Sequence, residues 1–103
     1  VLKAVASCLL DMTRYHDVVA RLGGEEFAVV APNMDENLLM KFAERIRKAI
    51  SGIVVTSGNV RLKVTASLGL AVWDGQESAE ELYRRADKHL YQAKRLGRNR
   101  VCA

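Results

Sequence analysis

The stretch Arg21-Leu22-Gly23-Gly24-Glu25-Glu26-Phe27 lies between two short apolar runs, residues 18–20 and 27–31. Two β-type runs joined through Gly-Gly predict a hairpin, because glycine reaches the positive φ angles that tight hairpin turns require. The bare glycine backbone also lets a bulky ligand approach closely. Successive side chains of a strand point to opposite faces, so we expect one glutamate to face a ligand site and the other a supporting layer. Taken alone, the pattern also fits a plain hairpin with solvated glutamates.

Composition limits the class of protein. The sequence has 103 residues, of which 50% are hydrophobic and 27% charged, enough for one globular unit with a single core. It has no apolar run long enough to cross a bilayer and no secretory leader. Cys8 and Cys102 are too few for a disulfide framework and lack metal-site spacing, so we interpret both as reduced thiols. We therefore expect a cytoplasmic domain, with membrane anchoring of a longer parent protein left open.

The net charge of +4 is unevenly distributed. Residues 1–60 hold equal numbers of basic and acidic side chains, whereas residues 61–103 hold nine basic and five acidic ones. The last basic run has no intervening acid and comprises Lys88, Lys94, Arg95, Arg98 and Arg100. It indicates a polyanionic partner. A solvated helix end is the alternative, since cations near a helix C-terminus complement its dipole.

Apolar spacing predicts two helices in the first half of the chain. Residues 1–13 have helical spacing but no capping residue at their start, which indicates a beginning inside an element. Asp35 is a plausible N-cap for a second helix that runs to about Ser51, and Gly52 lies where a C-terminal cap belongs.

The second half is predicted to hold strands and one more helix. Ser78 with Glu81 forms a capping box that opens a helix ending near residue 97. The predicted strands are Ile53–Thr56, Val60–Val72 and Asn99–Cys102, the second with apolar and polar residues alternating. This order of elements predicts an α+β sandwich of helices on a mostly antiparallel sheet.

Several ordered motifs resemble one known family. Residues 23–27 resemble the signature of the GGDEF diguanylate cyclases, in the variant with Glu at the third position. Further matches are residues 14–17, 43–47, 65–71 and 86–101, so the resemblance covers essentially all 103 residues. It implies a ferredoxin-like, nucleotidyl-cyclase-like fold. Residues 1–103 would form the C-terminal two-thirds of a GGDEF domain, with the first strand and helix missing.

The resemblance also implies an activity, the condensation of two GTP molecules into cyclic di-GMP and pyrophosphate. Glu25 matches the position that binds Mg²⁺ or Mn²⁺ and accepts a proton, and Glu26 a neighbouring catalytic acid. Gly24 matches the position where backbone meets the nucleotide, and Lys94 and Arg98 match the contacts to the triphosphate. In the family a homodimer is needed for catalysis, and an upstream sensor or receiver domain is expected.

A product-inhibition site is implied by a second motif. Arg14 and Asp17 match an Arg-x-x-Asp motif that grips cyclic di-GMP in the family, and Arg45 matches a further arginine of that site. A guanidinium suits this role because its planar fork bonds a guanine edge or a phosphate bidentately. The alternative is an ordinary surface Arg–Asp pair, worth well under ~1 kcal/mol.

The sequence departs from the family pattern at its N-terminal end. A metal-holding aspartate on the first strand, and an Asn and Asp that read guanine, have no counterpart in residues 1–103. We therefore expect this chain alone to be inactive on GTP. We also expect that it belongs to a longer protein, is completed by another chain, or pairs its exposed edges by swapping.

Two other functions remain open from the sequence. One is a non-catalytic module that binds cyclic di-GMP or GTP through Arg14, Asp17 and Arg45. The other is a nucleic-acid-binding ferredoxin-like domain, which we disfavour because no aromatic residue lies at a stacking position on a strand. His16 and His89 are predicted to be structural. Asp87 is either a local partner of Lys88 or Tyr91, or a residue of the site.

Overall fold

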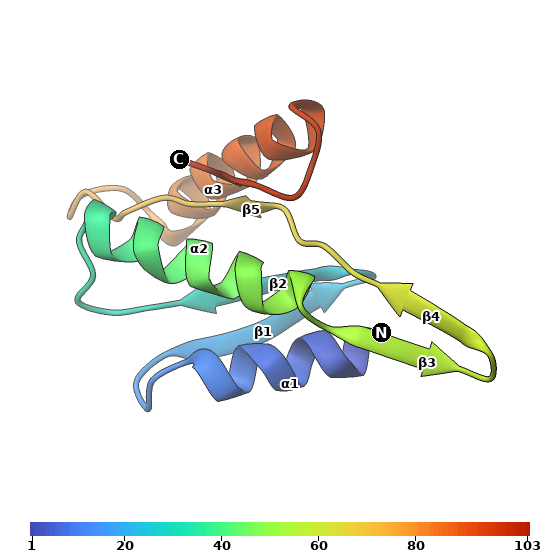
Figure 1. Ribbon diagram of the computed structural model, residues 1–103. Helices are drawn as coiled ribbons and strands as arrows, with labels where there is room; N and C mark the ends of the chain where they lie inside the picture. The colour runs from blue at the N-terminus through green and yellow to red at the C-terminus, as the bar shows by residue number, and fades with distance from the viewer.

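Three helices and six short strands form the computed structural model, which describes all residues 1–103 (Figure 1). In chain order they are α1 (Leu2–Met12), β1 (Val18–Gly23), β2 (Glu26–Val30), α2 (Glu36–Ser51), β3 (Val54–Ser57), β4 (Val60–Lys63), β5 (Leu68–Gly69), α3 (Ala79–Arg95) and β6 (Val101–Cys102). The predicted α+β class is confirmed.

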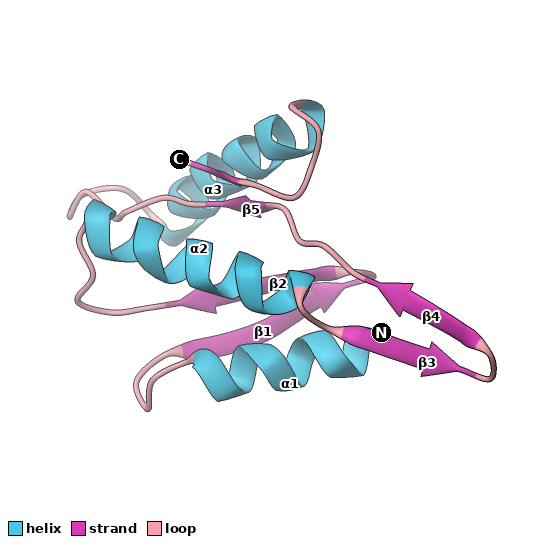
Figure 2. Cartoon of the chain, viewed as in Figure 1, coloured by secondary structure: helices cyan, strands magenta, loops and turns pink.

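The strands form three separate two-stranded ladders (Figure 2). β1 pairs with β2 and β3 with β4, both antiparallel, whereas β5 pairs with β6 in parallel. No ladder joins β2 to β5, so each of these strands keeps one unpaired edge. The mostly antiparallel pairing that the sequence predicts is confirmed, since two of the three ladders are antiparallel, and the strands are divided among three ladders.

The long strand predicted over Val60–Val72 is also corrected. Only residues 60–63 and 68–69 are strand, because residues 64–67 have no ladder partner. Val64, Ala66 and Leu68 still pack against the core, as their alternation predicts. Val60 and Leu62 continue the same alternation but are exposed, because no helix covers that end.

The core lies between α1, α2 and the strands beneath them. Leu9 of α1 packs with Phe42, Ile46 and Ile50 of α2, and half-buried strand residues such as Val29 lie against this cluster. Only six residues of the chain are buried. The accessible surface is 7299 Å², against about 5,800 Å² expected for a compact protein of this mass. Much apolar side-chain surface therefore remains open.

The strand β5 is sandwiched between two helices. Leu68 packs into the core under α2, and its neighbour Gly69 faces the opposite side, against α3. A Cβ atom at Gly69 would lie 2.2 Å from both the Ala86 carbonyl oxygen and the Leu90 amide nitrogen. The missing side chain thus lets α3 approach the strand, and α3 carries the basic end of the sequence.

Both predicted capped helices are confirmed. Asp35 Oδ1 accepts a hydrogen bond from the Leu38 amide at 2.8 Å and starts α2. Ser78 and Glu81 form the reciprocal capping box of α3, with both bonds at 3.1 Å. These caps satisfy amides that would otherwise lack partners in the first turn.

The ladder of β3 and β4 projects from the body as an arm (Figure 1). Its turn has Gly58 at φ +60° followed by a residue with ordinary φ, the combination of a type II′ hairpin turn. Val54, Val60 and Leu62 of the arm are exposed.

Candidate active site

The signature hairpin places its two glutamates differently. Gly23 pairs with Glu26 across the ladder, so Gly24 and Glu25 are the two residues of the turn. Gly24 has φ +53°, which favours glycine, and an added Cβ there would meet no atom within 4 Å. The register shifts between Arg21 and Gly23, a β-bulge. The turn backbone is therefore open to a ligand.

Arg21 stabilises the open turn through hydrogen bonds. Its guanidinium donates hydrogen bonds to the Gly24 carbonyl oxygen, from Nε at 3.2 Å and from Nη2 at 2.8 Å. These bonds reach across the turn residues and fix the carbonyl of the second signature glycine. The neighbouring Glu25 is exposed and makes no hydrogen bond or ion pair within the chain.

Glu26, the first residue of β2, faces α3. Its Oε1 atom lies 3.8 Å from Lys94 Nζ, with the two side chains 45% and 38% exposed. The two adjacent acids therefore differ in position, because Glu25 belongs to the turn and Glu26 to the strand, and Glu26 rather than Glu25 approaches the basic helix.

A hollow of about 210 Å³ lies between the hairpin and α3. Its lining residues are Glu26 from β2 and Asp87, Leu90, Tyr91 and Lys94 from α3. Leu90 and Tyr91 lie three and four positions after Asp87, and Lys94 follows them by four and three, which places all of these residues on one face of the helix. Asp87 makes no ion pair with Lys88 and no hydrogen bond with Tyr91, so its position in the hollow favours a site role.

Arg98 is not on the helix, although it follows Lys94 by four positions, the spacing of one helical turn. α3 ends at Arg95, and Gly97 at φ +121° starts a left-handed turn. The Arg98 amide donates to the Ala93 carbonyl oxygen at 2.9 Å, and the Gly97 amide to that of Lys94 at 3.5 Å. This is the Schellman pattern of a helix end. Arg98 is exposed and is not among the residues that line the hollow.

The residues Arg14 to Asp17 form a tight turn closed by a charged pair. The Asp17 amide donates to the Arg14 carbonyl oxygen at 3.0 Å, and the Arg14 amide donates to Asp17 Oδ2 at 2.8 Å. Arg14 Nε and Nη2 reach Asp17 Oδ1 at 3.1 and 2.9 Å. The four-residue spacing of the motif is thus the spacing at which the two ends of a turn meet.

This turn is also tied to the rest of the chain. Arg14 Nη2 donates to the Pro32 carbonyl oxygen at 2.5 Å, while Nη1 bonds no atom of the chain. The Asp17 carboxylate has no accessible surface, whereas the Arg14 side chain is 46% exposed. The hydrogen bonds from Arg14 hold the pKa of Asp17 below its ordinary value. Arg45 of α2 is exposed and makes no hydrogen bond or ion pair with either residue.

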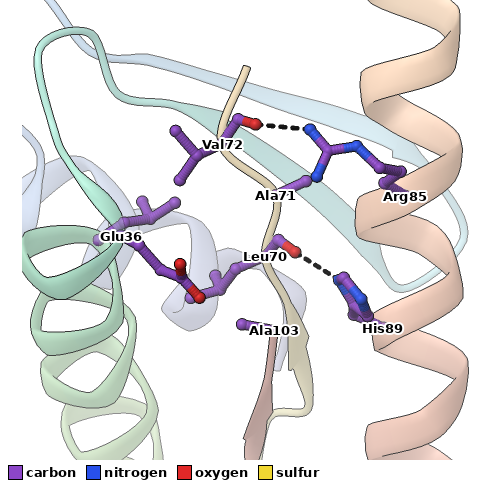
Figure 3. Close-up of a pocket in the computed structure, with 8 residues that line it drawn as sticks. Glu36, Leu70, Ala71, Val72, Arg85, His89 and Ala103 are labelled. Carbon is purple, nitrogen blue, oxygen red and sulfur yellow. Dashed lines mark hydrogen bonds between the residues drawn. The ribbon is translucent and has the colours of Figure 1, made fainter. Parts of the chain in front are cut away.

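A second hollow, of about 160 Å³, lies where the chain leaves β5 (Figure 3). Here the segment Leu70–Val72, which follows β5, runs between α2 and α3, and two α3 side chains bond its carbonyl groups. His89 Nδ1 bonds the Leu70 carbonyl oxygen at 2.6 Å, and Arg85 Nη2 donates to that of Val72 at 2.5 Å. Arg85 also pairs with Glu77. These contacts are consistent with the structural role predicted for His89.

The site offers few side chains that could hold a metal ion. No group of three or more His, Cys, Asp or Glu side chains lies close enough to hold an ion. Mg²⁺ is nevertheless commonly held by one or two carboxylates together with substrate phosphates. The unpartnered carboxylate of Glu25, beside an open backbone turn, fits that manner of binding.

The sequence is similar to proteins of one known family. The family described as diguanylate cyclase, GGDEF domain, matches residues 1–100. Diguanylate cyclase A of Treponema denticola is 41% identical over 102 residues, 98% of this chain and 28% of that protein. Diguanylate cyclase DgcM of Escherichia coli (strain K12) is 42% identical over 103 residues, 100% of this chain and 24% of that protein.

Solved structures agree with the sequence comparison. The GGDEF domain of DgcB from Caulobacter crescentus, solved in complex with c-di-GMP, superposes with a TM-score of 0.94 at 34% identity. That match covers 99% of this chain and 61% of that one. The active GGEEF domain of a diguanylate cyclase from Vibrio cholerae gives a TM-score of 0.77 at 29% identity.

The fold and the signature hairpin together define a nucleotidyl-cyclase domain. The chain belongs to the GGDEF family of diguanylate cyclase domains. It spans about a quarter of the length of the curated relatives described above. None of its helices is both long enough and apolar enough to cross a membrane.

Sequence reasoning missed two residues of the first hollow, Leu90 and Tyr91. Counting back from Lys94 by three, four and seven positions along the helix would have found Tyr91, Leu90 and Asp87.

Proposed function

We propose that this domain, within a longer protein, joins two GTP molecules into cyclic di-GMP, each nucleotide held by one of two facing copies. The 3′-oxygen of one GTP bonds the α-phosphorus of the other, and its proton passes to a carboxylate. The bond from that phosphorus to the bridging oxygen of the β-phosphate breaks, and pyrophosphate leaves with the electron pair. Two such steps close the ring.

The observation that carries the proposal is the approach of Glu26 to Lys94 across the first hollow. It brings the signature hairpin and the basic end of α3 together, although the two lie far apart in sequence. Lys94 and the nearby Arg98 supply cations for a leaving pyrophosphate, where preorganised charge contributes most. The open Gly24 backbone lets phosphates approach without steric cost.

We assign Glu25 as the acceptor of the proton from the 3′-hydroxyl. Its carboxylate extends from the turn into solvent with no partner in the chain, so it is available to a substrate hydroxyl. The same carboxylate would hold Mg²⁺ or Mn²⁺ together with phosphate oxygens, and such an ion neutralises triphosphate charge when bound. Glu26 keeps Lys94 beside the hairpin.

We assign the Arg14–Asp17 turn to product binding, with Arg45 as a further contact. The free Nη1 edge of Arg14 supports this assignment, because Asp17 and Pro32 occupy the rest of the guanidinium. A second candidate function, a cyclic di-GMP-binding module without catalysis, rests on the same turn. Turnover separates the two functions.

The decisive assay measures cyclic di-GMP formed from GTP and Mg²⁺ by the chain and by a form extended at its N-terminus. We expect turnover only in the extended form. Glu25→Gln should lower it by about a hundredfold or more, as loss of an essential charged group does. The matched control is Glu80→Gln, an exposed acid at the start of α3 paired only with Arg84. Full turnover by the Glu25→Gln variant would reject the assignment.

A further inference from the structure

We infer that the side chain of Tyr15 is a stacking platform for a guanine base of cyclic di-GMP bound at the Arg14–Asp17 turn. This inference rests on the product-binding role proposed above and adds a residue that determines base affinity. Tyr15 is 96% exposed, the highest value among the exposed large hydrophobic residues. An aromatic ring exposed to this extent has a face free to stack on a planar partner.

The position of Tyr15 follows from the turn. Arg14 and Asp17 are its two ends, so Tyr15 and His16 are its central residues and point outward from the tip. The rings of Tyr15 and His16 meet edge to face, with centroids 5.1 Å apart and planes at 81°. The imidazole therefore limits the rotation of the phenol ring without covering it.

The turn is rigid before any ligand arrives. It is held by one backbone hydrogen bond, the bond from the Arg14 amide to the Asp17 carboxylate, the bidentate Arg14–Asp17 pair and the bond to Pro32. A platform on a rigid support loses little conformational entropy when it is covered, so more of the stacking energy contributes to binding.

The adjacent cation indicates what the ring binds. Arg14 Nη1 is a free charged donor one residue away from Tyr15. Guanine presents a planar face for the phenol and acceptor atoms on its edge for a guanidinium, and a phosphodiester provides anionic oxygens close by. A cyclic dinucleotide combines all three groups in one small molecule, so it uses both residues together.

Titration calorimetry with cyclic di-GMP tests the inference on the chain itself. Loss of one base–aromatic stack should weaken affinity about five- to hundredfold in Tyr15→Ala. Tyr15→Phe keeps the ring and should bind like the native chain. The matched control is Tyr83→Ala, because Tyr83 is an exposed tyrosine on α3 away from the turn. Upfield shifts of the Tyr15 ring protons on adding ligand give a second, direct readout of stacking.

The outcomes separate this inference from the function on which it depends. If Arg14→Ala abolishes binding and Tyr15→Ala leaves it unchanged, the platform is rejected and the product site stands. If Arg14→Ala binds normally, or if the native chain does not bind the ligand, the product site and the platform are both rejected. Circular dichroism checks that each variant is folded, and an exposed tip residue should not affect it.

Discussion

Lys94 Nζ lies 3.8 Å from Oε1 of Glu26, a contact between residues 68 positions apart in the sequence. It is the only ion pair in the chain that joins a strand of the hairpin to α3. Both side chains are more than a third exposed, so a phosphate can reach the ammonium without unfolding any element. The pair therefore aligns two halves of a site more than it stabilises the fold.

Removal of this pair should have little effect on stability. An exposed ion pair is worth under ~1 kcal/mol, so Glu26→Gln should change the free energy of unfolding by no more than that. Urea denaturation of the variant and the native chain measures the difference. A loss several times larger would mean that the hollow is part of the folding core.

Gly69 should be far more sensitive. A methyl group at this position would overlap backbone atoms of α3, and overpacking of this kind costs about 1–3 kcal/mol or more. We expect Gly69→Ala to lower the urea midpoint clearly. Gly52→Ala is the control, because its φ is −86° and its nearest neighbour would lie at 3.5 Å. Equal effects of the two substitutions would contradict the close approach of α3.

The Arg14–Asp17 pair sets a pH dependence. Because the pKa of Asp17 is lowered in the folded state, its contribution to stability is complete above the unfolded value, near 3.8, and is lost as pH falls through the folded value. The destabilisation caused by Asp17→Asn should therefore be constant from neutral pH down to about that value and shrink below it. Denaturation series at several pH values measure this. A difference that shrinks already near neutral pH would refute the assignment.

The free edges of β2 and β5 should cause self-association. Unpaired strand edges present donors and acceptors to other chains. Each of the six strands has one such edge, and those of β2 and β5 belong to strands that pack against a partly exposed core. Light scattering should show a mass that rises with protein concentration. Extension at the N-terminus should reduce the effect if the added segment covers these edges. A compact monomer at high concentration would contradict the prediction.

Local signals predicted the elements well. The caps at Asp35 and Ser78 and the Gly-Gly hairpin involve neighbours in sequence, so short motifs determine them. The orientation of the two glutamates could not be predicted in the same way. A bulge before Gly23 and a turn at Gly24–Glu25 set which acid faces α3, and alternation alone does not reveal a bulge.

Long-range pairing was the least predictable feature. Residues 64–67 have the alternation of a strand, yet a strand needs a partner edge, and none lies beside them. The position of Arg98 could not be predicted for a different reason. Arg98 follows Lys94 at helical spacing in the sequence, but the helix ends at Arg95, and the left-handed turn at Gly97 changes the direction of the chain before Arg98.

The arm formed by β3 and β4 has a practical use. Its tip at Gly58 and Asn59 is a short turn beyond the packed helices, and an added Cβ at Gly58 would meet no atom within 4 Å. Inserted segments are tolerated best at such exposed tips. A fluorescent label or an affinity tag placed there would report on the domain while leaving the hairpin, α3 and the Arg14–Asp17 turn undisturbed.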